Sequence, residues 1–222
     1  MKLLLTSNGL TNKLIADALF KLVDKKPEDI SLVFVPTASN MEAEDKGWLI
    51  DNLIDLKKQN FKSIDIVDIS AMSKDIWLPR FEEADVLFFG GGNEYHLMRW
   101  LNKSGLSDLL PELLKTKVYV GLSAGSVLTG KDLLLETSQL IHSEDLIEAE
   151  NMKALGFVNF YFLPHLNSNW FEKRREKEIK QAVQEKGIKE KVYVLDDDTA
   201  LKITDGKIEV VGEGKHLIFN DK

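Results

Sequence analysis

The chain contains no cysteine among its 222 residues. Its absence excludes a disulfide framework, a thiolate nucleophile, and zinc or iron–sulfur sites held by cysteine. Covalent catalysis in this chain must therefore use an oxygen or a nitrogen nucleophile. We expect no metal and no other cofactor.

Basic residues are also in short supply, because 36 Asp and Glu face 29 Lys and Arg, giving a formal net charge of −7. A surface of this sign repels nucleic acid and anionic membranes unless a basic patch overrides it. The only dense basic cluster, Lys173–Arg175, alternates with glutamates and is typical of a solvated helix face. We expect neither nucleic acid nor a membrane as partner.

Long hydrophobic runs are missing as well. The first apolar stretch, Leu3–Leu5, is too short for a signal peptide, and no later run could span a bilayer. These features predict a cytoplasmic protein. The sequence leaves its oligomeric state open, a homodimer included.

What the sequence does contain is an alternation of short apolar runs with amphipathic stretches. Runs rich in Val, Ile, Leu and Phe predict parallel strands covered on both faces, and helical spacing of apolar residues marks the segments between them. After Leu195, turns at Asp205-Gly206 and Gly212–Gly214 predict an antiparallel hairpin region at the sheet's edge. We expect an α/β fold, an αβα sandwich with a mostly parallel central sheet, in one domain spanning residues 1–222. The predicted strands are Lys2–Thr6, Ser31–Pro36, Ile64–Ile69, Asp85–Phe89, Lys117–Gly121, Phe160–Leu163 and Val192–Leu195, and the clearest helical segments are 12–25 and 43–59.

The turn Gly121–Gly125, with the sequence Gly-Leu-Ser-Ala-Gly, carries the strongest candidate for chemistry. It joins a buried strand to a helix-compatible segment, as in a nucleophile elbow, where small neighbours permit a strained central residue. The elbow would expose the hydroxyl of Ser123 at a helix N-terminus, which favours developing negative charge. The alternative is a glycine-rich turn that binds phosphate or nothing.

A second glycine cluster, Gly90–Asn93, follows the predicted strand 85–89. Backbone amides in such a loop can approach a ligand closely. We expect the amide of Gly92, or of Gly91, to form a two-donor oxyanion hole with the amide of Ala124. The alternative is a tight turn capped by Asn93.

A catalytic serine needs a base, and histidine is the usual one. The four histidines of the chain are His96, His142, His165 and His216. His165 is the leading candidate, because it follows a predicted strand at the edge where open α/β sheets place their sites.

The acidic turn Asp196–Asp198 follows another predicted strand and could orient the base by accepting a hydrogen bond from its second nitrogen. A calcium-binding or solvated turn is the alternative. Asp132 and Asp145 are weaker candidates for the orienting acid.

Taken together, these motifs resemble the peptidase E family of serine peptidases, which includes aspartyl dipeptidases and, more distantly, cyanophycinases. The resemblance rests on five motifs in the family's order. They are Phe34–Ser39, Gly90–Asn93, Gly121–Gly125, Pro164-His165 and Leu195–Leu201.

The resemblance implies a fold like the class I glutamine amidotransferases and a triad of Ser123, His165 and Asp197, where most members have Glu as the acid. Asp196 is the fallback for the acid. It also implies a small peptide as substrate, with Arg175 gripping the carboxylate of an N-terminal Asp. Asn93 is the second expected substrate-binding residue.

Two other functions remain open at this point. An esterase of the α/β-hydrolase type would combine Ser123 with Asp197 and His216 in that chain order. A non-catalytic protein could bind an acidic small molecule in the same pocket.

Overall fold

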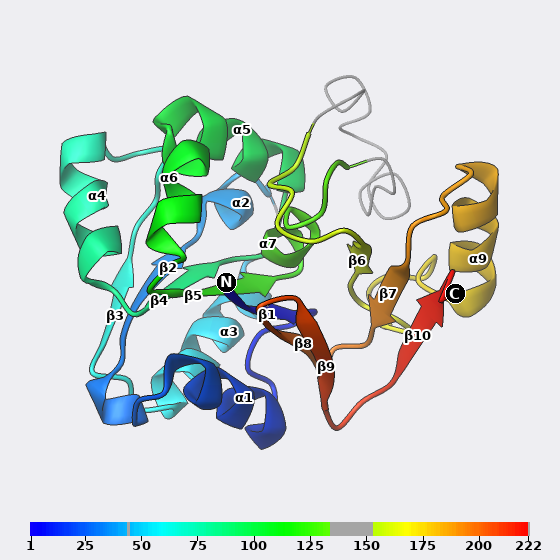
Figure 1. Cartoon of the computed structure of the whole chain (residues 1–222), viewed down its shortest axis with the longest axis horizontal. Helices are drawn as coiled ribbons and strands as arrows, with labels where there is room; N and C mark the ends of the chain where they lie inside the picture. Colours follow the sequence, from blue (N-terminus) through cyan, green and yellow to red (C-terminus); the bar gives the residue numbers. More distant parts are fainter. Residues whose placement is uncertain (44, 134–152, 222) are drawn as a thin grey trace.

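The structure, a computed structural model, describes residues 1–43, 45–133 and 153–221. In this part of the chain the strands form a seven-stranded sheet of order β3-β2-β4-β5-β1-β8-β9 and a three-stranded sheet of order β10-β7-β6 (Figure 1). The strands are β1 (Lys2–Thr6), β2 (Ser31–Val35), β3 (Ser63–Ile66), β4 (Val86–Phe89), β5 (Val118–Leu122), β6 (Tyr161–Leu163), β7 (Val192–Leu195), β8 (Thr199–Thr204), β9 (Lys207–Gly212) and β10 (His216–Phe219).

Helices cover both faces of the large sheet (Figure 1). The helices α1 and α3 pack on one face around a core that includes Ile15, Leu19 and Leu56. On the other face α4, α5, α6 and α7 enclose a second core that includes Trp77 and Leu97. The described helices are α1 (Lys13–Val23), α2 (Thr37–Asn40), α3 (Gly47–Lys58), α4 (Lys74–Glu83), α5 (Glu94–Ser104), α6 (Leu106–Leu113), α7 (Ala124–Val127) and α9 (Glu176–Glu185), with a 3₁₀ turn at Pro27–Asp29.

The large sheet is parallel from β3 to β1, and the antiparallel β8 and β9 close its far edge. The αβα sandwich and the edge hairpin are therefore as the sequence predicts. The placement of two predicted strands is different. In the small sheet β7 pairs with β6 on one side and with β10 on the other, and α9 and the apolar face of β10 give these strands a core of their own.

The basic cluster at 173–175 is not a helix face, contrary to the prediction. Arg175 precedes α9 in extended conformation (φ −111°, ψ 153°), and the Arg174 side chain is fully buried. The charged residues before α9 therefore belong to a loop. This loop contains a tight turn, in which the Arg174 amide donates to the carbonyl of Phe171.

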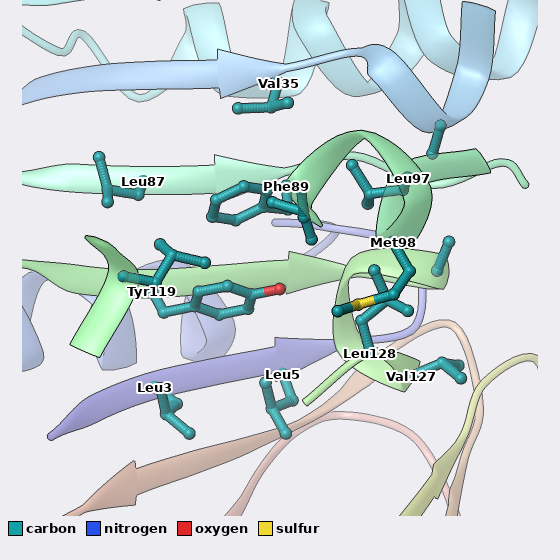
Figure 2. Packing of buried hydrophobic residues seen from close by; sticks show 14 of the residues in the cluster. Leu3, Leu5, Val35, Leu87, Phe89, Leu97, Met98, Tyr119, Val127 and Leu128 are labelled. Carbon is teal, nitrogen blue, oxygen red and sulfur yellow. The ribbon is translucent and has the colours of Figure 1, made fainter. Parts of the chain in front are cut away.

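The adjacent parallel strands β4 and β5 bring the two glycine motifs together, because both motifs lie at the carboxyl ends of these strands. Below the ends of these strands the Phe89 and Tyr119 rings lie near each other (Figure 2) and are stacked, with 4.8 Å between their centroids. The Tyr119 hydroxyl donates a 2.6 Å hydrogen bond to the carbonyl of Gly125. Burial raises the pKa of Tyr119, so this hydroxyl stays a donor and ties the turn after β5 to the core.

Candidate active site

Ser123 lies at the sharp turn between β5 and α7. Its backbone is in the positive-φ region (φ 47°, ψ −106°), which costs a residue with a side chain on the order of 1–3 kcal/mol. The Ser123 amide donates to the carbonyl of Thr6 in β1 at 3.0 Å, which helps to hold this conformation. A side chain at Gly125 would place its Cβ 2.2 Å from the carbonyl oxygen of Phe89, so the turn requires glycine there.

The glycine loop after β4 runs alongside Ser123. A Cβ built on Gly91 would lie 3.3 Å from the Ser123 Cβ, and one on Gly92 would lie 2.4 Å from the Ala38 carbonyl oxygen. Gly92 has φ 121°, a conformation that favours glycine. Within the part of the chain that the structure describes, no protein acceptor takes a hydrogen bond from the backbone amides of Gly91, Gly92 or Ala124. These amides can therefore serve a ligand.

His165 lies beside Ser123, at the end of β6. Its Nε2 is 3.0 Å from Ser123 Oγ, and its ring stacks on Phe171 with 4.5 Å between centroids. His165 also has a positive φ, 66°. The side chain is only 10% exposed, so protein atoms surround most of the ring.

Asp197 contacts the other nitrogen of the same ring. Its Oδ1 is 2.6 Å from His165 Nδ1, and its turn is fixed from the β1–α1 loop. There the Thr11 hydroxyl donates to the Asp197 carbonyl at 3.0 Å, and the Asn12 amide donates to the Asp198 carbonyl at 2.9 Å. These contacts bring the backbone close enough for the short aspartate side chain to reach the ring.

Asp196, the fallback for the acid, has a structural role in the turn. Its carboxylate accepts hydrogen bonds from the Asp198 amide (3.2 Å), the Thr199 hydroxyl (2.7 Å) and the Lys215 amide. It therefore joins the acidic turn to the segment that leads into β10, and it does not contact the His165 ring.

The other candidate histidines and acids lie apart from this arrangement. The His216 side chain lines a cavity of about 460 Å³ together with Asn167 and Lys215, and no hydrogen bond between described residues joins it to Ser123 or Asp197. The His96 ring faces Trp100 on α5, and Asp132 accepts a hydrogen bond from the Tyr161 hydroxyl. His142 and Asp145 lie outside the described residues.

Chemically, the arrangement is a continuous line of hydrogen bonds from a carboxylate through an imidazole to a hydroxyl. With its Nδ1–H donating to Asp197, the ring presents Nε2 as the acceptor for the proton of Ser123. Residues 3–211 match the family model of peptidase family S51. The chain belongs to peptidase family S51.

Relatives of this S51 chain include other peptidases. The peptidase Lin0382 of Listeria innocua serovar 6a, itself named as uncharacterized, is 27% identical over 199 residues, covering 86% of this chain and 93% of that protein. Peptidase E of Streptomyces coelicolor is 26% identical over 148 residues, covering 64% of this chain and 58% of that protein.

Solved structures show the same fold. A structure from Listeria monocytogenes EGD-e, provisionally assigned to peptidase E, superposes with a TM-score of 0.75 at 22% identity, covering 96% of this chain and 98% of that one. A peptidase from an acI-B1 Actinobacterium gives a TM-score of 0.72 at 17% identity, covering 97% and 88%. Together with the family match, these likenesses confirm the fold and the resemblance to the peptidase E family.

The two expected substrate-binding residues of this S51 chain are already engaged with protein groups. The Asn93 Oδ1 caps α5 by accepting a hydrogen bond from the His96 amide at 2.8 Å. The Arg175 guanidinium donates through Nη1 to the carbonyls of Ser168 (3.0 Å) and Phe171 (3.2 Å). Asn93 thus stabilises the start of α5 after the glycine loop, and Arg175 stabilises the loop whose Phe171 stacks on the His165 ring.

Arg174 is the arginine that sequence reasoning passed over. Its side chain is fully buried, and none of its three guanidinium nitrogens has a hydrogen-bond acceptor among the described residues. Burial lowers the pKa of Arg174 to about 9, an effect that the nearby carboxylate of Glu94 partly offsets. A buried guanidinium with open donors is unusual, and its cost calls for an anionic or water partner.

The described residues contain no cluster of three or more His, Asp or Glu side chains that could hold a metal ion. Nor does a helix of the described segments have the length and apolar character needed to cross a membrane.

Proposed function

We propose that the chain is a serine exopeptidase that hydrolyses small peptides, dipeptides with an N-terminal Asp in particular, through Ser123, His165 and Asp197. The observation that carries the proposal is the pair of contacts at the His165 ring, 3.0 Å from Nε2 to Ser123 Oγ and 2.6 Å from Nδ1 to Asp197 Oδ1. Both distances lie within hydrogen-bond reach for a nucleophile, a base and an orienting group.

In the proposed reaction, Ser123 Oγ attacks the peptide carbonyl carbon while His165 Nε2 takes the hydroxyl proton. Asp197 stabilises the imidazolium and holds its tautomer. The tetrahedral intermediate collapses when His165 returns the proton to the leaving amine and the C–N bond breaks. Water, activated by the same imidazole, then hydrolyses the acyl-enzyme and releases Ser123.

The oxyanion of the intermediate would be held by the amides of Gly92 and Ala124. Three features support this role. Gly91 packs against the Ser123 side chain, the amides have no protein acceptor among the described residues, and Ala124 begins α7, so its amide points out of a helix N-terminus. Donors of this kind are each worth about 10²–10³ in kcat.

Selectivity for an acidic residue is proposed to reside in the adjacent pair Arg174 and Arg175. The family resemblance implies that Arg175 binds the substrate carboxylate. Arg174, in contrast, has guanidinium N–H groups with no hydrogen-bond acceptor among the described residues. A charged hydrogen bond contributes roughly 1.5–3 kcal/mol, so we expect a preference of about 10- to 150-fold for Asp over the uncharged isostere Asn at the same position.

The test of the proposal is hydrolysis of Asp-Leu and Asn-Leu by the wild type and by Ser123→Ala, with a fluorophosphonate used to label the serine. We expect the wild type to cleave Asp-Leu and to be labelled at Ser123, and the variant to do neither. Cleavage at equal rates by both proteins would refute the role of Ser123. If Asp-Leu bound without hydrolysis or labelling, the chain would be a binding protein.

The specificity is tested separately, with Arg174→Gln and Arg175→Gln and the same two dipeptides. If a variant loses the preference for Asp-Leu but still hydrolyses Asn-Leu, the arginine it replaces is the one that binds the side-chain carboxylate of the substrate. An unchanged ratio in both variants would overturn the specificity and leave the catalytic proposal intact.

A further inference from the structure

Ser7, the first residue after β1, connects three parts of the candidate site. Its side chain is completely buried. The Ser7 hydroxyl donates to the Leu195 carbonyl at 2.9 Å and accepts from the His165 backbone amide at 3.3 Å. One hydroxyl on the large sheet therefore joins the ends of two strands of the small sheet, β6 and β7.

These two strand ends carry the base and the acid. His165 is two residues beyond β6, and Asp197 is two residues beyond β7. The Leu195 carbonyl also accepts a hydrogen bond from the Leu166 amide at 2.9 Å. The loop that carries His165 is therefore bonded to the end of β7, next to the turn that carries Asp197. Ser7 connects the large sheet to both of these segments, through the Leu195 carbonyl and the His165 amide.

The backbone of His165 depends on such support because its φ is 66°. A non-glycine residue keeps a positive φ only where its surroundings hold it there. The Ser7 hydroxyl is the acceptor for the His165 amide, and without that hydroxyl the structure offers this amide no other acceptor among the described residues.

The neighbouring residue fixes the nucleophile in the same way. The Thr6 carbonyl accepts from the Ser123 amide at 3.0 Å, and the Thr6 hydroxyl donates to the Gly121 carbonyl at 2.8 Å. Consecutive residues at the end of β1 thus hold the backbones of Ser123 and of His165.

We propose that Ser7 is a positioning residue of the catalytic site, which sets the His165 ring between Ser123 and Asp197 by bonding the His165 amide and the Leu195 carbonyl. The inference rests on the proposed catalytic roles of those residues. Ser7 itself touches no reacting atom, so its effect is on the alignment of the base.

The test compares wild type with Ser7→Ala and Ser7→Cys. In Ser7→Ala we expect kcat for Asp-Leu to fall about 10- to 100-fold, as for a misplaced catalytic group, with KM within about twofold of wild type. Ser7→Cys replaces the hydroxyl by a somewhat larger thiol, which forms weaker hydrogen bonds, so its kcat should lie between those of the wild type and Ser7→Ala.

A second readout needs no substrate. The Nδ1 proton that His165 shares with Asp197 should give a strongly downfield proton resonance in the wild type, and this resonance should shift or broaden in Ser7→Ala. Thr129→Val is the matched control, because the Thr129 hydroxyl is equally buried and donates to the Ser126 carbonyl at 2.7 Å. The control should lose thermal stability to a similar extent and keep the resonance.

An unchanged resonance in Ser7→Ala would overturn the proposal, even for a chain that hydrolyses no peptide. Wild-type kcat in Ser7→Cys together with a resonance that matches the wild type would overturn it also. A failure of the wild type to cleave any peptide concerns the proposed function instead, because the resonance still reports on the geometry of His165.

Discussion

Replacing Asp197 by Asn tests the proposed orientation of His165 with the smallest change in shape. The carboxylate Oδ1 now accepts from Nδ1 at 2.6 Å, a short contact of the charge-assisted kind. A carboxamide can instead present its NH₂ group to Nδ1. The ring would then carry its proton on Nε2, which faces Ser123 Oγ at 3.0 Å and could no longer accept the serine proton.

The expected loss follows from this change of tautomer together with the loss of the charge that stabilises the imidazolium. A wrong tautomer lowers kcat of a serine peptidase by about 10⁴-fold, which corresponds to roughly 5.5 kcal/mol of transition-state stabilisation. KM should change little, because Asp197 is expected to contact the base and not the substrate. The free energy of unfolding should also change little, since the side chain is 34% exposed.

The assay is release of p-nitroaniline from Asp-p-nitroanilide at saturating concentration, with thermal melting as the check on folding. Asp198→Asn is the matched control, because it removes the same charge from the same turn and its residue is exposed. We expect it to retain kcat within about twofold of wild type. The reasoning would be refuted if Asp197→Asn kept at least a third of the wild-type kcat, or if Asp198→Asn lost as much as Asp197→Asn.

Further predictions concern the residues that support the site. Asp196→Ala removes the acceptor of three hydrogen bonds and should lower the free energy of unfolding in urea by about 1–3 kcal/mol. Gly92→Ala places a Cβ 2.4 Å from a backbone oxygen of α2 and should lower kcat by about 10²-fold or more by displacing an oxyanion donor; Gly105→Ala, where φ is also positive but the space is open, should keep its activity. Tyr119→Phe leaves the buried Gly125 carbonyl without its 2.6 Å donor and should cost about 1–3 kcal/mol in the same urea titration.

Much of the fold could be predicted because buried parallel strands leave a clear pattern. The runs Lys2–Thr6 and Val192–Leu195 coincide with β1 and β7. The residues of a strand do not, however, determine which sheet it joins. The pattern of β7 is equally apolar whether its neighbours are β6 and β10 or the strands of the large sheet. The small sheet has a core of its own, formed with α9 and β10, which the residues of β7 alone do not reveal.

The candidate site divides in the same way. Ser123, His165 and Asp197 each follow a strand, so their positions along the chain predict that they lie at strand ends. The distinction between Asp197 and Asp196 depends on which carboxylate faces the ring, and neighbouring residues in a turn do not reveal it. The burial of Arg174 could not be predicted, because the alternating charges at 172–178 indicate a solvated helix face, whereas α9 begins only at Glu176.

The contacts of Asp197 support its proposed role as the acid, at a position where the family resemblance leads one to expect Glu. The backbones of Ser123 and His165 are bonded to Thr6 and Ser7 at the end of β1, and β1 is paired on both sides, by β5 and β8. Asp197 lies instead in the turn between β7 and β8, held through side chains of the β1–α1 loop. The contacts to Thr11 and Asn12 set how close the backbone of this turn comes to the His165 ring, and at that position the Asp197 carboxylate reaches Nδ1 at 2.6 Å. A glutamate at this position would need a turn whose backbone lies farther from the ring, because its side chain is longer by one methylene.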